Sequence, residues 1–276
     1  MKTLRFFGMV LFAVLMCANF VACGGGDEND PTINESPTTN NGENTTTNNG
    51  EGTIIKTKKL IKILDDNEPL YTFSYENKEK ISSFKYQESD YENVTIYNWN
   101  ENSITAVDDK SERIYNLEND LITTFVEIYP GEEDDEWECF YNSSKQITKI
   151  TEGEYTFTFN WEGDKLIEFI EEYSSSKYIS TYKYSGKTTK GWTPIKSLDR
   201  VWHLFENNEI IYAHPELIGL NINQLPDEVE IIDYDGSKEN IYFTYAFDNE
   251  GYVTERTLIV KRNNESYTYT YSYVWE

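Results

Sequence analysis

Residues 267–275, near the end of the chain, read Tyr-Thr-Tyr-Thr-Tyr-Ser-Tyr-Val-Trp, and this alternation decides the fold class. In an extended strand, successive side chains point to opposite faces of a sheet. All five aromatic rings of the stretch therefore share one face, and the threonines and the serine share the other. Aromatic residues also favour strands over helices. The stretch predicts a β-strand with one aromatic face and one polar face that meets water.

The same sequence pattern, which we call the hairpin motif, recurs along the chain. It consists of an alternating aromatic strand, a short polar turn, and a second strand that begins with an aliphatic residue. Hairpins of this form span residues 71–84, 94–107, 141–150, 155–169 and 242–254. Their short turns, rich in Asn, Gly and Asp, suit antiparallel hairpins and leave no room for a crossover helix. The sequence predicts an all-β fold, a long antiparallel meander of about a dozen strands. Because open sheets rarely exceed about ten strands, we expect an open or closed barrel-like sheet.

A transmembrane barrel would show the same alternation, with its apolar face turned to lipid. The strands predicted here hold about five to seven residues before a charged turn, whereas a spanning strand needs about 9 to 11. We therefore expect the body of the protein to lie outside a bilayer.

Residues 196–219 interrupt the alternation. Ser197 is a typical N-cap residue, and four apolar residues follow it at helical spacing. They are Leu198, Val201, Trp202 and Phe205. A second short turn is predicted to begin at His214-Pro215 and to end by Gly219. We expect this helical insert to cover an open end or edge of the sheet, where strand groups would otherwise stay unpaired.

The first 22 residues have the layout of a signal peptide, with Lys2 and Arg5 ahead of an apolar run. Residues 20–23 read Phe-Val-Ala-Cys and resemble the bacterial lipobox, in which a small residue precedes the cysteine that receives the lipid. Cys17 follows Met16, which is too large for the peptidase. Cys23 is therefore the predicted lipid attachment site. A single-span anchor is the alternative, because residues 6–23 come close to the roughly 18 to 20 residues that cross a bilayer.

Residues 23–52 are predicted to be the lipidated cysteine and a disordered linker. Residues 24–52 are almost all Gly, Asn, Thr, Glu, Asp and Pro, with Ile33 the only large apolar residue. Such a segment cannot bury enough surface to offset its ordering entropy. Residues 27–30, Asp-Glu-Asn-Asp, are similar to the acidic tract of surface-exported lipoproteins of the Bacteroidetes. That similarity favours the cell surface of the outer membrane, with the periplasmic face as the alternative. Residues 53–276 are predicted to form a single antiparallel β domain.

Several further segments carry a resemblance to a known family. They are residues 194–195 (Pro-Ile), 214–220 (His-Pro-Glu-Leu-Ile-Gly-Leu), 225–226 (Leu-Pro), 248–253 (Asp-Asn-Glu-Gly-Tyr-Val) and 273–275 (Tyr-Val-Trp). Together with the hairpin motif, they resemble a Bacteroidetes lipoprotein family of unknown function described as having a porin-like β fold. The resemblance covers about residue 54 to the end. It implies the barrel-like architecture and supplies no catalytic or ligand residues.

The chain is strongly acidic, with a formal net charge of −25 at pH 7. Such a charge repels nucleic acids and anionic lipid headgroups. We therefore expect no nucleic-acid partner, and membrane contact only through the N-terminal lipid. Cys139 is the only thiol of the predicted body, so no internal disulfide can form. We expect this cysteine to be buried and inert.

Few residues of the predicted body suit catalysis. His203 and His214 are the only histidines of the chain, and both lie in the helical insert, which favours structural roles. The sequence has no nucleophile elbow, no phosphate-binding glycine loop and no paired cysteine motif. We therefore expect no catalytic residues, no metal site and no cofactor.

Two acidic stretches contain the hard oxygen ligands that calcium prefers. Residues 132–136, Glu-Glu-Asp-Asp-Glu, are more typical of a solvated loop. Asp233-Tyr234-Asp235-Gly236 is similar to the start of a calcium loop, but no bidentate acid follows at the required position. A hairpin turn that ends in glycine is the better interpretation.

Two classes of function fit these features. The favoured one is a non-catalytic module that binds a glycan, a peptide or a partner protein through aromatic side chains. The alternative is a carboxylate-dependent glycoside hydrolase, since 49 Asp and Glu residues could include a pair at catalytic separation. A structural or assembly component of the envelope is a third possibility.

Replacing Cys23 with Ala should abolish incorporation of a fatty-acid analogue, because the modified thiol is removed. Metabolic labelling and in-gel detection measure this. Cys17→Ala is the matched control and should leave labelling intact. Labelling that survives Cys23→Ala and disappears in Cys17→Ala would move the attachment site to Cys17.

Overall fold

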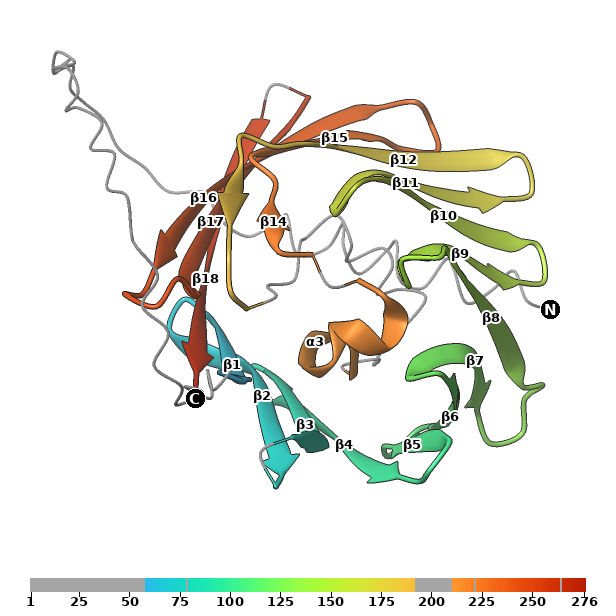
Figure 1. Cartoon of the computed structure of the whole chain (residues 1–276). Coiled ribbons are helices and arrows are strands. Elements are labelled where there is room, and N and C mark those ends of the chain that lie inside the picture. The colour runs from blue at the N-terminus through green and yellow to red at the C-terminus, as the bar shows by residue number, and fades with distance from the viewer. Residues whose placement is uncertain (1–57, 78, 192–209, 221, 264) are drawn as a thin grey trace, which may run out of the picture. The chain divides into compact units, whose positions relative to one another are not determined.

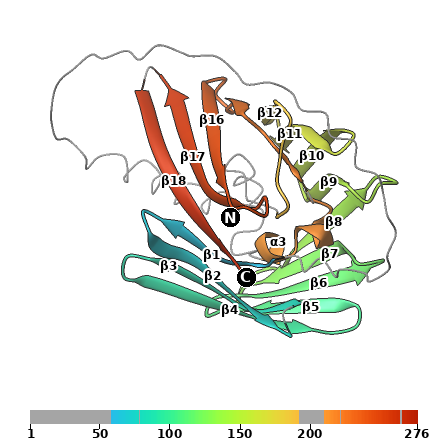
Figure 2. The same ribbon diagram turned by 60° about the vertical axis from the view of Figure 1, so that its left-hand side comes forward.

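The computed structural model describes residues 58–77, 79–191, 210–220, 222–263 and 265–276, which belong to one compact unit, Ile54–Glu276. Sixteen antiparallel strands form a closed barrel, and β13 and β14 form a separate two-stranded sheet. Figures 1 and 2 show the strands as a continuous wall in chain order. The predicted signal peptide, Cys17, Cys23 and the linker lie outside the described residues.

The strands run in chain order around the barrel, and β12 pairs directly with β15. Their bounds are β1 (Leu60–Asp65), β2 (Glu68–Glu76), β3 (Lys80–Glu88), β4 (Tyr91–Trp99), β5 (Ser103–Val107), β6 (Glu112–Glu118), β7 (Leu121–Ile128), β8 (Asp135–Tyr141), β9 (Ile147–Glu152), β10 (Tyr155–Glu162), β11 (Lys165–Tyr173), β12 (Ser176–Lys183), β13 (Lys187–Thr188), β14 (Gln224–Leu225), β15 (Glu228–Ile232), β16 (Lys238–Phe247), β17 (Val253–Arg262) and β18 (Glu265–Trp275).

The barrel closes because the last strand pairs with the first. Ile63 of β1 stands opposite Tyr273 of β18. Just beyond these strands, the Lys59 N–H donates to the Glu276 carbonyl at 2.8 Å, and the Glu276 N–H donates back at 3.0 Å. The predicted all-β, barrel-like meander is thus confirmed, and of the open and closed forms the closed one is found.

The aromatic face of each strand points into the barrel. In β10, Phe157 and Phe159 are each 2% exposed, while the adjacent Thr156 and Thr158 are only partly buried. The same alternation gives β4 a buried Tyr97 beside an exposed Ile96. Buried side chains from almost every barrel strand join one core cluster with those of the insert. The interior is therefore a packed apolar core, and most of the outer wall is polar.

The sheet is larger than the sequence predicted, with strands of 5 to 11 residues. The expected strand length was too short, because charged residues at the strand ends also take part in backbone pairing. Glu68 and Glu76, for example, are the two ends of β2, and their side chains reach water. Strands such as β6 and β7 were missed because aliphatic and charged residues replace most of the rings. Strand length therefore no longer argues against a bilayer-spanning barrel, but the polarity of the outer wall does.

The described part of the insert consists of α3 (Ile210–Ala213) and the 3-10 turn η4 (Pro215–Ile218). The predicted turn from Pro215 to Gly219 is confirmed: Gly219 ends it with φ of 64°. A Cβ atom at Gly219 would lie 2.3 Å from the Lys145 carbonyl oxygen, so only glycine fits. The predicted helical residues 197–205, His203 among them, lie outside the described residues.

The insert packs inside the barrel and does not cover an edge, because the barrel strands leave no edge open. Both views place α3 within the ring of strands (Figures 1 and 2). The Tyr212 ring lies 5.4 Å from the Tyr71 ring of β2, centroid to centroid. On the far side, the Ile147 N–H donates to the Gly219 carbonyl at 3.4 Å. The insert therefore contacts two distant parts of the barrel wall, β2 and β9. No helix among the described residues is long and apolar enough to cross a membrane.

Aromatic donors secure one end of the barrel. Each lies at or near the end of a strand and donates to the backbone carbonyl at the start of the strand before it. Trp161, for example, donates its Nε1–H to the Ile147 carbonyl at 2.7 Å. These described residues, which we call the anchored rim, are Tyr75, Trp99, Tyr141, Trp161, Tyr184, Tyr245 and Trp275. Strand β6 departs from the pattern, since Leu117 occupies the corresponding position. The anchored rim links the two neighbouring strands of each of these pairs and fixes their register.

Truncating Phe157 to Ala should lower the free energy of unfolding by about 3 to 5 kcal/mol, because the ring is buried in the core. Chemical denaturation measures the change. Thr158→Ala, on the polar face of the same strand, is the control and should cost much less. A loss below about 1 kcal/mol for Phe157→Ala would contradict the inward assignment of the aromatic face.

Candidate functional site

Inward-facing tyrosines at the end of the barrel opposite the anchored rim keep much of their surface in water. Tyr91 at the start of β4 is 43% exposed, and Tyr267 and Tyr269 at the start of β18 are 39% and 37% exposed. Their register shows that they face inward: Tyr267 pairs with buried Val260, and Tyr269 pairs with buried Leu258. We call this end of the barrel the tyrosine rim.

Tyr155 and Tyr173 extend the tyrosine rim onto β10 and β11. They are direct partners across the two strands, and their rings stack with centroids 4.2 Å apart at an interplanar angle of 18°. Burial, reinforced by the neighbouring Tyr173 and by nearby carboxylates, raises the pKa of Tyr155 to about 12. Tyr155 therefore stays neutral at physiological pH, and the stacked pair presents flat ring surface.

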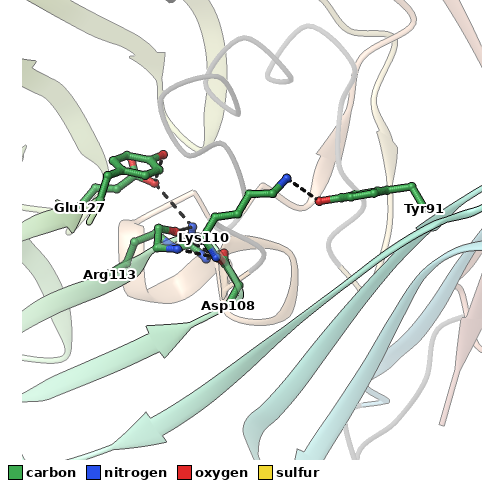
Figure 3. A network of polar contacts seen from close by, with 7 residues as sticks. Tyr91, Asp108, Lys110, Arg113 and Glu127 are labelled. Carbon is green, nitrogen blue, oxygen red and sulfur yellow. Dashed lines mark hydrogen bonds and ion pairs between the residues drawn. The ribbon is translucent and has the colours of Figure 1, made fainter. Parts of the chain in front are cut away.

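A polar network lies inside the wall beside Tyr91 (Figure 3). At its centre is the guanidinium of Arg113, whose side chain is fully buried. Arg113 Nη2 donates to Asp108 Oδ2 at 2.9 Å, and Nη1 lies 3.5 Å from Glu127 Oε1. The Tyr129 hydroxyl donates to the same Glu127 oxygen at 2.8 Å. The network thus holds one buried cation between two carboxylates.

The turn between β5 and β6 shapes this network and connects it to the tyrosine rim. Asp108 Oδ1 accepts the backbone N–H groups of Lys110 and Ser111, each at 2.8 Å. The Lys110 ammonium donates to the Tyr91 hydroxyl at 2.9 Å. One short turn therefore orients both a buried carboxylate and an exposed ring, as Figure 3 shows.

The two carboxyl groups of the network have opposite pKa shifts. Burial raises the pKa of Asp108, but the Lys110 N–H, the Arg113 guanidinium and the Ser111 N–H outweigh it and hold the pKa below its usual value. Burial raises the pKa of Glu127 by more than Tyr129 and Arg113 lower it. Asp108 is therefore the firmly ionised partner of Arg113, and Glu127 takes up a proton more readily.

A second buried cation lies on β17. Arg256 is 5% exposed, and its guanidinium carbon lies 5.3 Å from the Tyr271 ring centroid and 5.8 Å from that of Tyr273. Glu171 of β11 is likewise 5% exposed and faces the interior. Both sides of the interior therefore carry charge among rings, where a cation over an aromatic face is stabilised.

Sequence reasoning missed Asp108, Arg113, Glu127 and Arg256. A usable signal existed, because each buried charge on a strand occupies a position in the alternation that an apolar or aromatic residue would normally take. Arg113 stands two residues before the buried Tyr115, and Glu127 two residues after the buried Phe125. A charged residue at a strand position where the alternation would place an aromatic residue therefore marks a polar site inside the barrel.

The structure gives His214 a packing role, as expected. It is 5% exposed, and its Nε2 accepts the Ile81 backbone N–H at 3.1 Å. Its Nδ1 lies 2.9 Å from Glu216 Oε1, and the Trp99 ring stands edge-on at 5.2 Å. His214 therefore fixes the insert to the anchored rim and is remote from the tyrosine rim.

The remaining residues considered for chemistry are placed as follows. Cys139 is buried, as predicted, and burial raises the pKa of its thiol to about 12. Residues 233–236 form the predicted hairpin turn, with the Gly236 N–H donating to the Asp233 carbonyl at 2.8 Å and φ of 79° at Gly236. In the acidic stretch 132–136, Glu132 to Asp134 lie exposed in the loop between β7 and β8, and the last two residues begin β8. Within the described ranges, no group of three or more His, Cys, Asp or Glu residues is arranged to hold a metal ion.

Replacing Asp108 with Asn should lower the free energy of unfolding by about 3 to 5 kcal/mol at neutral pH, because it removes the strongest charged partner of a buried cation. The folded-state pKa of Asp108 lies below 3.8, so its stabilisation is present above that pH and is lost as pH falls through the folded-state value. Chemical denaturation at several pH values measures both effects. Asp109→Asn, at the exposed neighbour, should change little. Equal losses in the two variants would contradict the role given to Asp108.

Comparison with known proteins supports the fold. No protein-family description and no curated protein matches the sequence. A porin-like protein from Bacteroides uniformis has a similar structure, with a TM-score of 0.64 and 18% sequence identity over 79% of this chain and 94% of that one. A porin-like protein from Bacteroides vulgatus aligns with a TM-score of 0.48 and 13% identity over 79% of this chain and 99% of that one. The chain thus has the porin-like β fold that its sequence resembled.

Proposed function

We propose that this chain is a non-catalytic binding module, held at the bacterial outer membrane by a lipid on Cys23, that contacts its ligand through the tyrosine rim. The ligand class is a glycan, a peptide or a partner protein. The cell surface is the favoured location, and the periplasmic face is the alternative. The polar outer wall supports a barrel that stands outside the bilayer, because a spanning barrel turns an apolar band to lipid.

The exposure of inward-facing tyrosines is the observation that carries the proposal. Rings needed only for packing are covered, as in the core around Phe157, or tied to the backbone, as in the anchored rim. Tyr91, Tyr267 and Tyr269 are instead more than a third exposed. Tyrosine supplies flat contact area with a polar tip and loses little conformational entropy on binding. An acidic chain that presents such rings suits a neutral or cationic ligand.

One observation favours a carboxylate-dependent glycoside hydrolase as the second candidate. Asp108 and Glu127 have pKa values shifted in opposite directions, which is the pattern of a base and an acid that share a site. Against this role, both carboxylates contact the buried Arg113. Contact of both carboxylates with the same guanidinium is better explained by a structural role, in which they neutralise Arg113 in the wall beside Tyr91.

A binding screen against soluble glycans and peptides, run beside a turnover assay on the same compounds, tests the proposal. Tyr91→Ala and Tyr267→Ala should each weaken binding of a ligand found in the screen by about 1 to 3 kcal/mol, because stacked ring surface is lost. Phe140→Ala is the matched control: Phe140 is 44% exposed but lies on the outer wall of β8, so binding should not change.

Glu127→Gln separates the two candidate functions. Loss of one positioned acid typically lowers a catalysed rate by about 10² to 10⁴-fold, whereas a binding module has no turnover to lose. Reproducible turnover that Glu127→Gln abolishes would overturn the binding module in favour of the hydrolase. Rim variants that bind as tightly as the unaltered protein would remove the tyrosine rim as the contact surface.

A further inference from the structure

Six aliphatic side chains gather on the outer wall of β4 to β7, on the face opposite the core. The three most exposed are Ile96 at 47%, Val94 at 40% and Val107 at 39%. We call this surface the outer patch; its members are Val94, Ile96, Val107, Ile114, Val126 and Ile128. Their outward direction follows from the alternation, because the residues between them on β4, Thr95 and Tyr97, are buried in the interior.

Strand pairing brings the members of the outer patch together. Ile96 stands directly opposite Val107, and Ile114 stands directly opposite Val126. Glu112 lies between Val107 and Ile128, opposite both, and places one carboxylate inside the patch. All six patch residues are β-branched, so their rotamers are restricted and binding costs them little entropy. An exposed apolar surface of this kind is typical of an interaction site on a water-soluble domain.

Carboxylates border the outer patch. Glu112 lies within it, and Glu136 and Glu138 flank it on the outward face of β8, with Glu136 opposite Val126. All three are exposed, and no ion pair links them to another described residue. The cation nearest the patch by strand pairing, Lys85 opposite Val94, is already paired with Glu92 at 2.5 Å. The surface is therefore mainly apolar, with one carboxylate inside it and two at its border.

We propose that the outer patch is a docking site for a partner protein that presents aliphatic side chains flanked by Lys or Arg. The apolar side chains would supply the affinity, and the unpaired carboxylates would select a basic border on the partner. Docking is face to face, because the barrel strands are all paired and offer no edge for an added strand. This site is separate from the tyrosine rim and does not depend on the function proposed there.

A second copy of this chain fits the outer patch poorly. A symmetric contact would bring the same carboxylates of two chains together, and each chain carries a net charge of −25. A basic hollow at one end of β16 to β18, lined by Lys238, Lys261 and Arg262, would match the charge. Its other lining residues are polar or acidic, including Asn240 and Glu265, so it offers no apolar surface to cover the patch. An anionic lipid surface is disfavoured by the same carboxylates.

A synthetic peptide of alternating Leu and Lys tests the proposal, with the same peptide carrying Glu in place of Lys as its counterpart. Binding to the full-length protein carrying Cys23→Ala, which lacks the lipid, is followed by fluorescence anisotropy. Ile96→Thr combined with Val107→Thr should weaken binding of the Leu/Lys peptide about tenfold or more without changing any charge. Thr keeps the β-branched shape that the strands favour, so the fold should persist.

Ile170→Thr combined with Ile179→Thr is the matched control, because these two isoleucines are also partners on the outer wall, on β11 and β12. It should leave binding unchanged, and the Leu/Glu peptide should not bind. Glu136→Gln combined with Glu138→Gln should weaken binding and flatten its dependence on salt.

Four results would overturn the proposal. They are equal loss in the control variant, equal binding of the two peptides, patch-dependent dimerisation seen by analytical ultracentrifugation, and patch-dependent binding to phosphatidylglycerol vesicles. Dimerisation would identify a second copy as the occupant, and vesicle binding would identify lipid. Variants of the tyrosine rim should leave peptide binding unchanged, which keeps this test independent of the function proposed there.

Discussion

The interior of a sixteen-stranded barrel must be filled, and the rest of the structure depends on that constraint. Barrels with 16 to 18 strands enclose a water-filled channel when their inner face is polar. Here the inner face is apolar, so an empty interior would leave that whole face in water. Large rings fill the space from the wall inward, and the insert with Tyr212 and His214 fills it from the centre. A high aromatic content, 15% of the whole chain, therefore suits an interior of this size.

The anchored rim fixes the register between neighbouring strands, which is hard to specify in a large barrel of many similar strands. A slip of one residue between two strands would move every ring from the core to water. Each anchored ring reaches the carbonyl at the start of the previous strand, as Trp275 does to Val253 at 2.6 Å. That contact exists in only one register. At the opposite end, the Tyr91 hydroxyl accepts a hydrogen bond from the Lys110 side chain and does not bond to a strand carbonyl in this way.

Much of the fold could be predicted from the alternation, and the candidate site could not. Period-two patterning in residues 155–161 and 267–275 assigned the buried face correctly, and Pro215 with Gly219 marked the 3-10 turn. Closure could not be predicted, because it depends on pairing between β1 and β18, more than 200 residues apart in the chain. The network around Arg113 was missed for a different reason. Its residues lie on consecutive strands and a connecting turn, but single charges in a sequence of 49 Asp and Glu residues do not stand out unless the alternation of each strand is followed.

The pairing of the first strand with the last also controls when the protein can fold. Lys59 and Glu276 exchange backbone hydrogen bonds, so the ring cannot close until β18 and Glu276 are available. Contacts so distant in the chain give slow folding. A chain emerging from the ribosome, or threading through an export channel, lacks its closing strand and keeps β1 and the newest strand as open edges. If the chain is exported, as proposed above, this delay is useful, because a translocating chain has to stay unfolded. The same delay leaves two unpaired strand edges, which can pair with other chains, until β18 arrives.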